Sequence, residues 1–229
     1  MQPLTIQERL TRVRSRMITA ERHAHRPPGS VCLIAVSKTQ PPEALISAYQ
    51  LRQRHFGENY LQEALAKQQS LAHYPITWHF IGPVQSNKTK LIANHFSWVH
   101  SVERLKIAER LNQQRRPELG PLNICLQINI DAESSKSGIA LEQLPGLAAE
   151  ISTFRNLRLR GLMSIPENTE SSAATRYSFR RMREAFESLR ANGYRLDSLS
   201  MGMSADLELA IQEGATLVRI GTSIFGERG

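Results

Sequence analysis

The sequence predicts a single α/β domain of the (β/α)8 or TIM-barrel class, with an extra helix at the N-terminus. From residue 31 onward, short apolar runs alternate with longer segments of helical period, and eight such runs can be found. Eight parallel strands are the number that closes this kind of barrel. A chain of 229 residues, 41% hydrophobic and 22% charged, suits one domain that buries about 70% of its unfolded surface. We therefore expect residues 1–229 to form one domain.

The N-terminal segment predicts an amphipathic helix between residues 5 and 25. Apolar residues stand near helical spacing among many arginines, and Pro27-Pro28-Gly29 ends the pattern. The apolar positions are Ile6, Leu10, Val13, Met17 and Ile18. We expect this helix, within residues 1–28, to pack on the barrel.

The remaining elements alternate regularly. The expected strands are 31–37, 55–56, 78–81, 98–101, 123–130, 157–163, 199–201 and 217–220. The expected helices between them are 42–51, 59–69, 88–94, 104–114, 141–153, 175–192 and 206–213. Continuous apolar runs that alternate with helices favour parallel strands joined by right-handed crossovers. The second and seventh runs are short, and an open doubly wound sheet is the alternative if either is not a strand. Residues 164–174 are polar and predict a surface loop.

Composition narrows the class of partner. The net charge of +8 fits an anionic partner such as nucleic acid, a membrane surface or a phosphorylated small molecule. No run of 18 apolar residues and no targeting leader is seen, so we expect a cytoplasmic protein without a membrane span. Cys32 and Cys125 lie inside apolar runs and should behave as core residues. No Cys or His cluster has ligand spacing, so we expect no metal.

Lys38 ends the first apolar run. Period-two alternation places it on the face of Cys32, Ile34 and Val36, so its amine would lie at the mouth of the barrel if that face is the interior. Partial burial and neighbouring cations lower the pKa of a lysine and expose the free amine that a Schiff base with an aldehyde requires. The alternative is a lysine that reaches from a strand end into water.

The last two expected strands are followed by loops that suit a phosphate. Ser204 follows Gly202 in one loop, and Gly221 precedes Thr222 in the other. Glycines allow backbone amides to approach a ligand, hydroxyls add donors, and these two loops are the frequent phosphate site of the fold. The alternative is that the two glycines only make tight turns.

Arg219 would share the interior face with Lys38. A buried arginine needs a partner, which could be an inward carboxylate such as Glu58 or Glu103, or the pyridine nitrogen of a cofactor. A phosphate site, an amine and an inward arginine together match one cofactor, pyridoxal 5′-phosphate.

Six motifs, taken together, resemble a known family across nearly the whole chain. They are AVSKT (35–39), FGENYLQE (56–63), WHFIGPVQSNK (78–88), ESSKSG (133–138), RGLM (160–163) and SMGMSADLELAIQEGATLVRIGTSIFG (200–226). The chain resembles the pyridoxal phosphate homeostasis proteins, also called the YggS or PROSC family, whose barrel is akin to the N-terminal domain of alanine racemase. The resemblance implies that Lys38 forms the Schiff base and that Arg219 meets the pyridine nitrogen. It also implies phosphate binding by Ser204, Gly221 and Thr222, with Asn59 lining the pocket.

The resemblance implies a carrier that holds pyridoxal phosphate and delivers it to apo-enzymes. An arginine at the pyridine nitrogen discourages protonation there and weakens the ring as an electron sink. The racemases carry a second domain that this sequence, which ends at Gly229, would lack. We therefore expect a non-catalytic monomer. The alternative is a weak racemase-like enzyme with Tyr60 or His79 as proton carrier, although a satisfied core histidine is the expected state of His79 and packing on its own helix that of Tyr60.

Two basic features remain. RYSFRRMR (176–183) would place Arg176, Arg180 and Arg183 on one helical face, which raises nucleic-acid binding, but a solvated outer helix is the expected reading. Lys136 could hold a second phosphate or relay the cofactor outward, although an exposed loop lysine usually only aids solubility.

Overall fold

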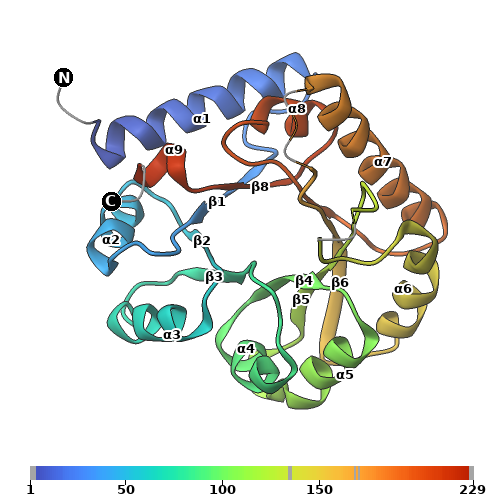
Figure 1. Cartoon of the computed structure of the whole chain (residues 1–229). Helices are drawn as coiled ribbons and strands as arrows, with labels where there is room; N and C mark the ends of the chain where they lie inside the picture. Colours follow the sequence, from blue (N-terminus) through green and yellow to red (C-terminus); the bar gives the residue numbers. More distant parts are fainter. Residues whose placement is uncertain (1–3, 134–135, 168, 170, 227–229) are drawn as a thin grey trace.

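The computed structural model is a closed barrel of eight parallel strands in the order β1-β2-β3-β4-β5-β6-β7-β8 (Figure 1). The structure describes residues 4–133, 136–167, 169 and 171–226; Ser134 and Ser135 of the ESSKSG motif and residues 168 and 170 of the expected loop lie outside it. The strands are β1 (Cys32–Val36), β2 (His55–Glu58), β3 (Thr77–Phe80), β4 (Trp98–Val102), β5 (Leu122–Gln127), β6 (Leu157–Met163), β7 (Ser198–Ser200) and β8 (Leu217–Ile220). Both short runs are strands, so the predicted barrel is confirmed and the open sheet is wrong.

Helices surround the barrel, as Figure 1 shows. They are α1 (Ile6–His23), α2 (Pro42–Gln50), α3 (Leu61–Ser70), α4 (Thr89–His95), α5 (Leu105–Gln114), α6 (Leu144–Ser152), α7 (Ser172–Ala191), α8 (Leu207–Gln212) and α9 (Thr222–Phe225). The helices expected from residues 88 and 141 begin as 3-10 turns, η1 (Ser86–Lys88) and η3 (Leu141–Gln143), and a further turn is η2 (Pro117–Leu119). None of the helices in the described part of the chain is both long and apolar enough to cross a membrane.

Two strands end more than one residue from the expected position. The second strand, β2, continues through Gly57 to Glu58 instead of ending at residue 56. The fifth strand ends at Gln127 and not at residue 130, because the chain turns to pair with a later segment. There Ile139 N donates to Gln127 O, and Asn129 N donates to Ile139 O. Asn129 Nδ2 also donates to Glu133 O at 2.8 Å, so this polar residue stabilises a loop.

The N-terminal helix α1 forms as predicted and is capped at its N-terminus. Thr5 caps it, with the Glu8 carboxylate accepting from Thr5 N at 2.8 Å, an arrangement that satisfies the first amides of a helix. Its buried side includes Leu10, Val13 and Met17. Ile18 was expected on the same side, but it is 37% exposed. Figure 1 shows α1 lying beside α8 and α9.

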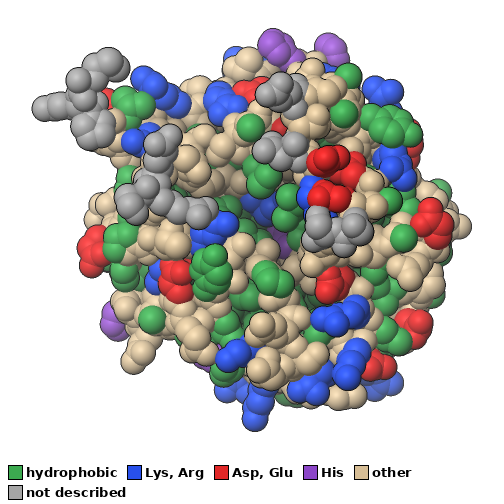
Figure 2. Space-filling model, viewed as in Figure 1, with side chains coloured by type: hydrophobic (Ala, Val, Ile, Leu, Met, Phe, Trp, Pro, Cys, Tyr) green, Lys and Arg blue, Asp and Glu red, His purple; other side chains and the backbone are tan. Residues whose placement is uncertain are grey.

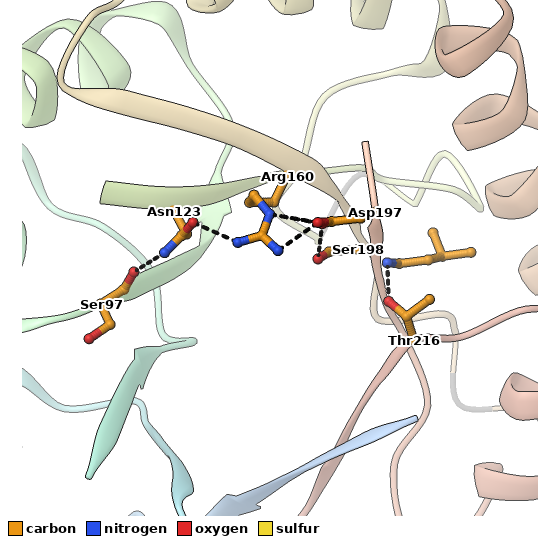
Figure 3. Close-up of polar contacts among 7 residues, drawn as sticks. Ser97, Asn123, Arg160, Asp197, Ser198 and Thr216 are labelled. Carbon is orange, nitrogen blue, oxygen red and sulfur yellow. Dashed lines mark hydrogen bonds and ion pairs between the residues drawn. The ribbon is translucent and has the colours of Figure 1, made fainter. Parts of the chain in front are cut away.

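The interior of the barrel is a small core separate from the one between strands and helices. It contains Ile34, Trp98, Cys125, Met163 and Leu217. Below it, near the N-terminal ends of the strands, Arg160 binds Asp197 at 2.6 Å and Asn123 at 2.8 Å (Figure 3). The guanidinium carbon lies 4.7 Å from the centre of the Trp98 ring. We call this end of the barrel the floor.

Candidate functional site

A cavity of about 320 Å³ opens at the C-terminal ends of the strands, where this fold places its ligand sites. It is lined by Val36, Lys38, Asn59, Ile81, Ile165, Met203, Ser204, Ala205, Arg219, Gly221 and Thr222. All six residues that the sequence predicted for a cofactor therefore line one cavity, whose size is within the range for small ligands. Figure 2 shows a hollow near the centre of the molecule with basic and hydrophobic side chains around it. A larger cavity of about 650 Å³, beside α5 and α6, contains none of the six.

Lys38 follows β1 and is held from the outer side of the barrel. The buried Lys67 of α3 donates from Nζ to Ser37 O at 2.6 Å and to Glu58 Oε1 at 2.8 Å. Ser37 Oγ also donates to Glu58, at 2.6 Å. On the other side of Lys38, Thr39 N donates to Glu63, which Lys67 binds as well. The backbone is thus fixed immediately before and after Lys38.

We call Lys67, Glu58, Glu63 and Ser37 the lysine clamp. Glu58 was a candidate for an inward partner of Arg219, but its side chain is completely buried and binds Lys67 of α3 on the outer side of β2. Burial raises the pKa of Glu58, while the hydrogen bonds from Lys67 and Ser37 oppose that shift. A buried carboxylate of this kind depends on its cation.

The loop after β7 is shaped by Gly202 and Asp206. Gly202 has φ +95°, and a Cβ there would collide with Ala210, so a glycine is required. Asp206 Oδ1 accepts from Met203 N at 2.5 Å, and Arg16 of α1 donates to Ser204 O at 3.0 Å. Gly202 thus makes a tight turn and does not line the cavity itself. Helix α1 contributes to the site by holding Ser204.

Gly221 lines the cavity between β8 and α9. A Cβ at this position would stand 3.3 Å from Val36 O, so glycine permits the close approach of this loop to β1. Thr222 follows as the first residue of α9 and is exposed towards the cavity mouth.

Arg219 is 4% exposed and lies inside the barrel. It donates from Nη1 to Ser200 Oγ at 2.7 Å and from Nη2 to Ser164 O at 2.9 Å. Burial lowers its pKa to about 10, so it stays protonated at neutral pH. The alternative of an ion pair with Glu58 or Glu103 is wrong for the described residues, because Glu58 binds Lys67 while Glu103 pairs with Arg104 and accepts from Gly138 N.

Asn59 directly follows β2, the strand beside β1, and its side chain lines the cavity. Its Oδ1 is buried and has no hydrogen-bond partner within the described part of the chain. Because a buried polar atom is normally satisfied, this oxygen is suited to a donor on a bound molecule.

The two candidate proton carriers of a racemase do not line the cavity. Tyr60 is the residue before α3 and is 55% exposed. His79 is completely buried and lies between His55 and His100, with ring nitrogens 3.0 and 2.9 Å away. The expectation of a satisfied core histidine is confirmed. Sequence reasoning did not connect the three histidines, although each occupies one of three consecutive strands.

The other basic candidates have partners outside the cavity. Lys136 binds Glu133 at 2.8 Å. Arg176 and Arg183 of α7 bind the buried Glu213 at 3.1 and 2.9 Å, so this face secures α7 beside α8 and is not a fully solvated helix. No group of three His, Cys, Asp or Glu in the described residues could hold a metal ion.

Comparison with known proteins gives a consistent result. Residues 9–229 match the family described as alanine racemase, N-terminal domain. The pyridoxal phosphate homeostasis protein of Pseudomonas aeruginosa is 57% identical over 98% of this chain and 96% of its own length, and that of Escherichia coli K12 is 48% identical over 97% of both. The structure of PipY of Synechococcus elongatus with PLP bound is 39% identical over 97% of this chain and 100% of its own, with a TM-score of 0.86.

Proposed function

The chain belongs to the family of the pyridoxal phosphate homeostasis proteins, and from that premise we propose that it binds pyridoxal 5′-phosphate in the cavity, holds it as a Schiff base at Lys38 and delivers it to apo-enzymes. The observation that carries this proposal is the meeting of six residues from four separate parts of the chain around one cavity. The amine suits the aldehyde of this cofactor, the buried guanidinium suits its pyridine nitrogen, and the two hydroxyls suit its phosphate.

Each residue has a distinct role in the proposal. The Lys38 amine condenses with the aldehyde of the cofactor, so a C=N bond forms and a water molecule leaves. Thr222 and Ser204 donate their hydroxyls to the phosphate near Gly221, where the backbone comes close. Arg219 points its charge at the pyridine nitrogen, and Asn59 offers an amide to the ring. When bound, the cofactor would supply an electrophilic carbon and an electron-accepting ring.

The lining of the cavity favours a carrier over an enzyme. Among the described residues that line it there is no His, Tyr, Asp or Glu, so Lys38 and Arg219 are its ionisable side chains and no further acid or base lies beside the amine. Arg219 remains charged and discourages protonation of the pyridine nitrogen. Two hydrophobic side chains at the cavity, Ile165 and Met203, are 41% and 40% exposed, which suits contact with a recipient protein.

A transfer experiment tests the proposal. The purified protein is loaded with pyridoxal phosphate, freed of excess, and mixed with an apo-enzyme in the presence of a protein that scavenges free cofactor. We expect recovery of the apo-enzyme to exceed that from an equal amount of free cofactor, and turnover of amino acids by the carrier itself to be negligible. Amino-acid turnover at about 1 per second or faster would show an enzyme instead of a carrier. Recovery no better than from free cofactor would reject delivery.

A further inference from the structure

A line of hydrogen bonds runs from Arg219 through the interior of the barrel to its floor. Ser200 Oγ lies 2.7 Å from Arg219 Nη1 and 2.9 Å from His100 Nδ1. His100 Nε2 lies 2.9 Å from His79 Nδ1. His79 Nε2 lies 3.0 Å from Nδ1 of His55, which begins β2 and is half-buried. We call Ser200, His100, His79 and His55 the histidine file.

Hydrogen-bond chemistry gives the file one direction. A guanidinium only donates, so Ser200 Oγ accepts from Arg219. The hydroxyl has one hydrogen, and His100 Nδ1 is its remaining partner in the part of the chain that the structure describes. If Ser200 donates to His100, every later contact follows: each histidine accepts at Nδ1 and donates from Nε2. The reverse direction would leave the buried Ser200 hydrogen without an acceptor there, which is costly.

The surroundings of the file keep its histidines neutral. Burial is the main cause that lowers the pKa of His100, to about 3, and that of His79 well below its usual value; Arg219 adds to the first shift and the neighbouring histidines to the second. Burial also lowers the pKa of His55. In the described structure, the other charged or titratable groups at the barrel interior and its ends include Lys38 after β1, Cys32 on β1, Cys125 on β5, Arg160 on β6, Asp197 before β7 and Asp206 after it.

The file is unusual for the interior of a barrel. Branched apolar side chains commonly fill this space, and burying polar rings has a free-energy cost unless each is hydrogen-bonded. Here, three rings on neighbouring strands lead to the one arginine of the cofactor cavity. If apolar residues filled the same space, Arg219 could still donate to Ser200. The Ser200 hydroxyl would, however, lose His100 Nδ1, the acceptor that orients it.

We infer that Ser200, His100, His79 and His55 are positioning residues for the cofactor site, acting through Arg219. This inference rests on the proposed function, because the cofactor is what Arg219 meets. The file directs an acceptor at Nη1 of Arg219, and Ser164 O accepts at Nη2, so the guanidinium is held from two sides. A histidine that took up a proton would donate at both nitrogens, and one of them would then face another donor. Protonation of one ring would therefore disturb the hydrogen bonds of its neighbours in the file as well.

The first test compares two serines of β7. Ser200→Ala removes the contact of the file with Arg219, whereas Ser198→Ala is a matched control, because Ser198 is also buried in the same strand but binds Asp197. Fluorescence titration with pyridoxal phosphate should show about tenfold weaker binding for Ser200→Ala and no change for Ser198→Ala. The absorption band of the bound cofactor should also change its pH dependence in Ser200→Ala alone.

The second test needs no cofactor. In ¹⁵N NMR spectra of the cofactor-free protein, the imidazoles of His55, His79 and His100 should all be neutral with the hydrogen on Nε2, and His79 and His100 should stay so down to about pH 5. A hydrogen on Nδ1 of His79 or His100 would overturn the direction of the file. Equal cofactor affinity of Ser200→Ala and wild type would overturn the positioning role alone. Failure of the wild-type protein to bind pyridoxal phosphate would overturn this role and the proposed function together.

Discussion

Arg219 is buried, and in the described structure no carboxylate forms a hydrogen bond or ion pair with its guanidinium, although Asp206 acts on it at longer range. Its partners in the described structure are a hydroxyl and a carbonyl oxygen, both uncharged. Its positive charge is therefore available to the cavity that it lines. For a pyridoxal protein, this favours an unprotonated pyridine ring and weak carbanion chemistry.

Replacing Arg219 by Glu tests this view of the ring. A carboxylate would let the pyridine nitrogen hold a proton, so exchange of the α-hydrogen of bound amino acids should rise above the wild-type level. Exchange is measured by NMR in deuterated water, after cofactor binding has been verified. Arg219→Gln is the control, because it removes the arginine without adding an acid. Equal exchange in the Glu and Gln variants would contradict the role given to this charge.

Two hydroxyls should account for part of the phosphate affinity. Thr222→Val and Ser204→Ala should each weaken binding of pyridoxal phosphate by about 1.5 to 3 kcal/mol, the usual contribution of a hydrogen bond to a charged group. Binding is followed by fluorescence titration. Thr153→Val and Ser152→Ala, exposed at the end of α6, are the matched controls and should bind normally. Unchanged affinity in the Thr222→Val/Ser204→Ala double variant would place the phosphate elsewhere.

At the level of elements, α3 is joined to the end of β1 by the lysine clamp. Lys67 is 4% exposed and Glu58 is completely buried, so their interaction is shielded from water. Removing one partner of a buried ion pair leaves the other charge uncompensated, which is more destabilising than replacing both.

Lys67→Met should therefore destabilise the fold by about 3 to 5 kcal/mol, measured by denaturant unfolding. Adding Glu58→Gln should recover much of this loss, because no unpaired charge then remains buried. Both variants should bind the cofactor more weakly than the wild type, since the backbone around Lys38 has lost its contact with Lys67. Lys90→Met, at an exposed position of α4, is the control and should change neither the stability nor the cofactor affinity. Equal instability of the single and double variants would argue against a buried ion pair as the source.

For the molecule as a whole, the histidines of the barrel interior connect stability to pH. His79 and His100 have lowered pKa values in the folded protein, so below about pH 6.5 the unfolded chain binds protons that the folded protein does not. The free energy of unfolding is therefore highest, as far as these histidines are concerned, above that pH, and it falls as pH decreases. Between pH 8 and 5.5, each such histidine should contribute a loss of about 1.4 kcal/mol in the free energy of unfolding.

The matched variants are His100→Phe and His73→Gln. The Phe variant starts from a different stability, but its loss between pH 8 and 5.5 should be smaller by the share of one histidine. The exposed His73 should leave the dependence unchanged when replaced by Gln. A wild-type free energy of unfolding that does not fall over this range would mean that the interior histidines are not held neutral.

The fold was predictable because local patterns specify most of it. Strands such as β1 and β5 are mainly apolar runs and the helices show their own period, so the short β2 and β7, which carry polar residues, could be placed by the regular alternation of the elements around them. Five of the six cavity residues were predictable because this fold places strand ends together, and Asn59 was expected from the family resemblance. Alternation placed Lys38 and Arg219 on faces that would be interior, and the barrel itself decides which face that is.

The features that escaped prediction depend on contacts between distant elements. Lys67 lies on a helix whose pattern says only that it is partly buried, and its contact with Glu58 depends on how α3 sits on the sheet. The histidine file requires the register between β2, β3, β4 and β7, which no local pattern specifies. Glu58 was considered as an inward partner of Arg219 because the end of β2 was predicted two residues too early, which left the direction of this side chain open.

The central claim is that Lys38 holds pyridoxal phosphate covalently, and one measurement tests it most directly. The protein is incubated with the cofactor, the Schiff base is reduced with borohydride, and the modified peptide is identified by mass spectrometry. We expect the cofactor on Lys38, and no modified peptide from Lys38→Ala. Modification of another lysine, with Lys136 as the first alternative, or unchanged labelling of Lys38→Ala, would contradict the account.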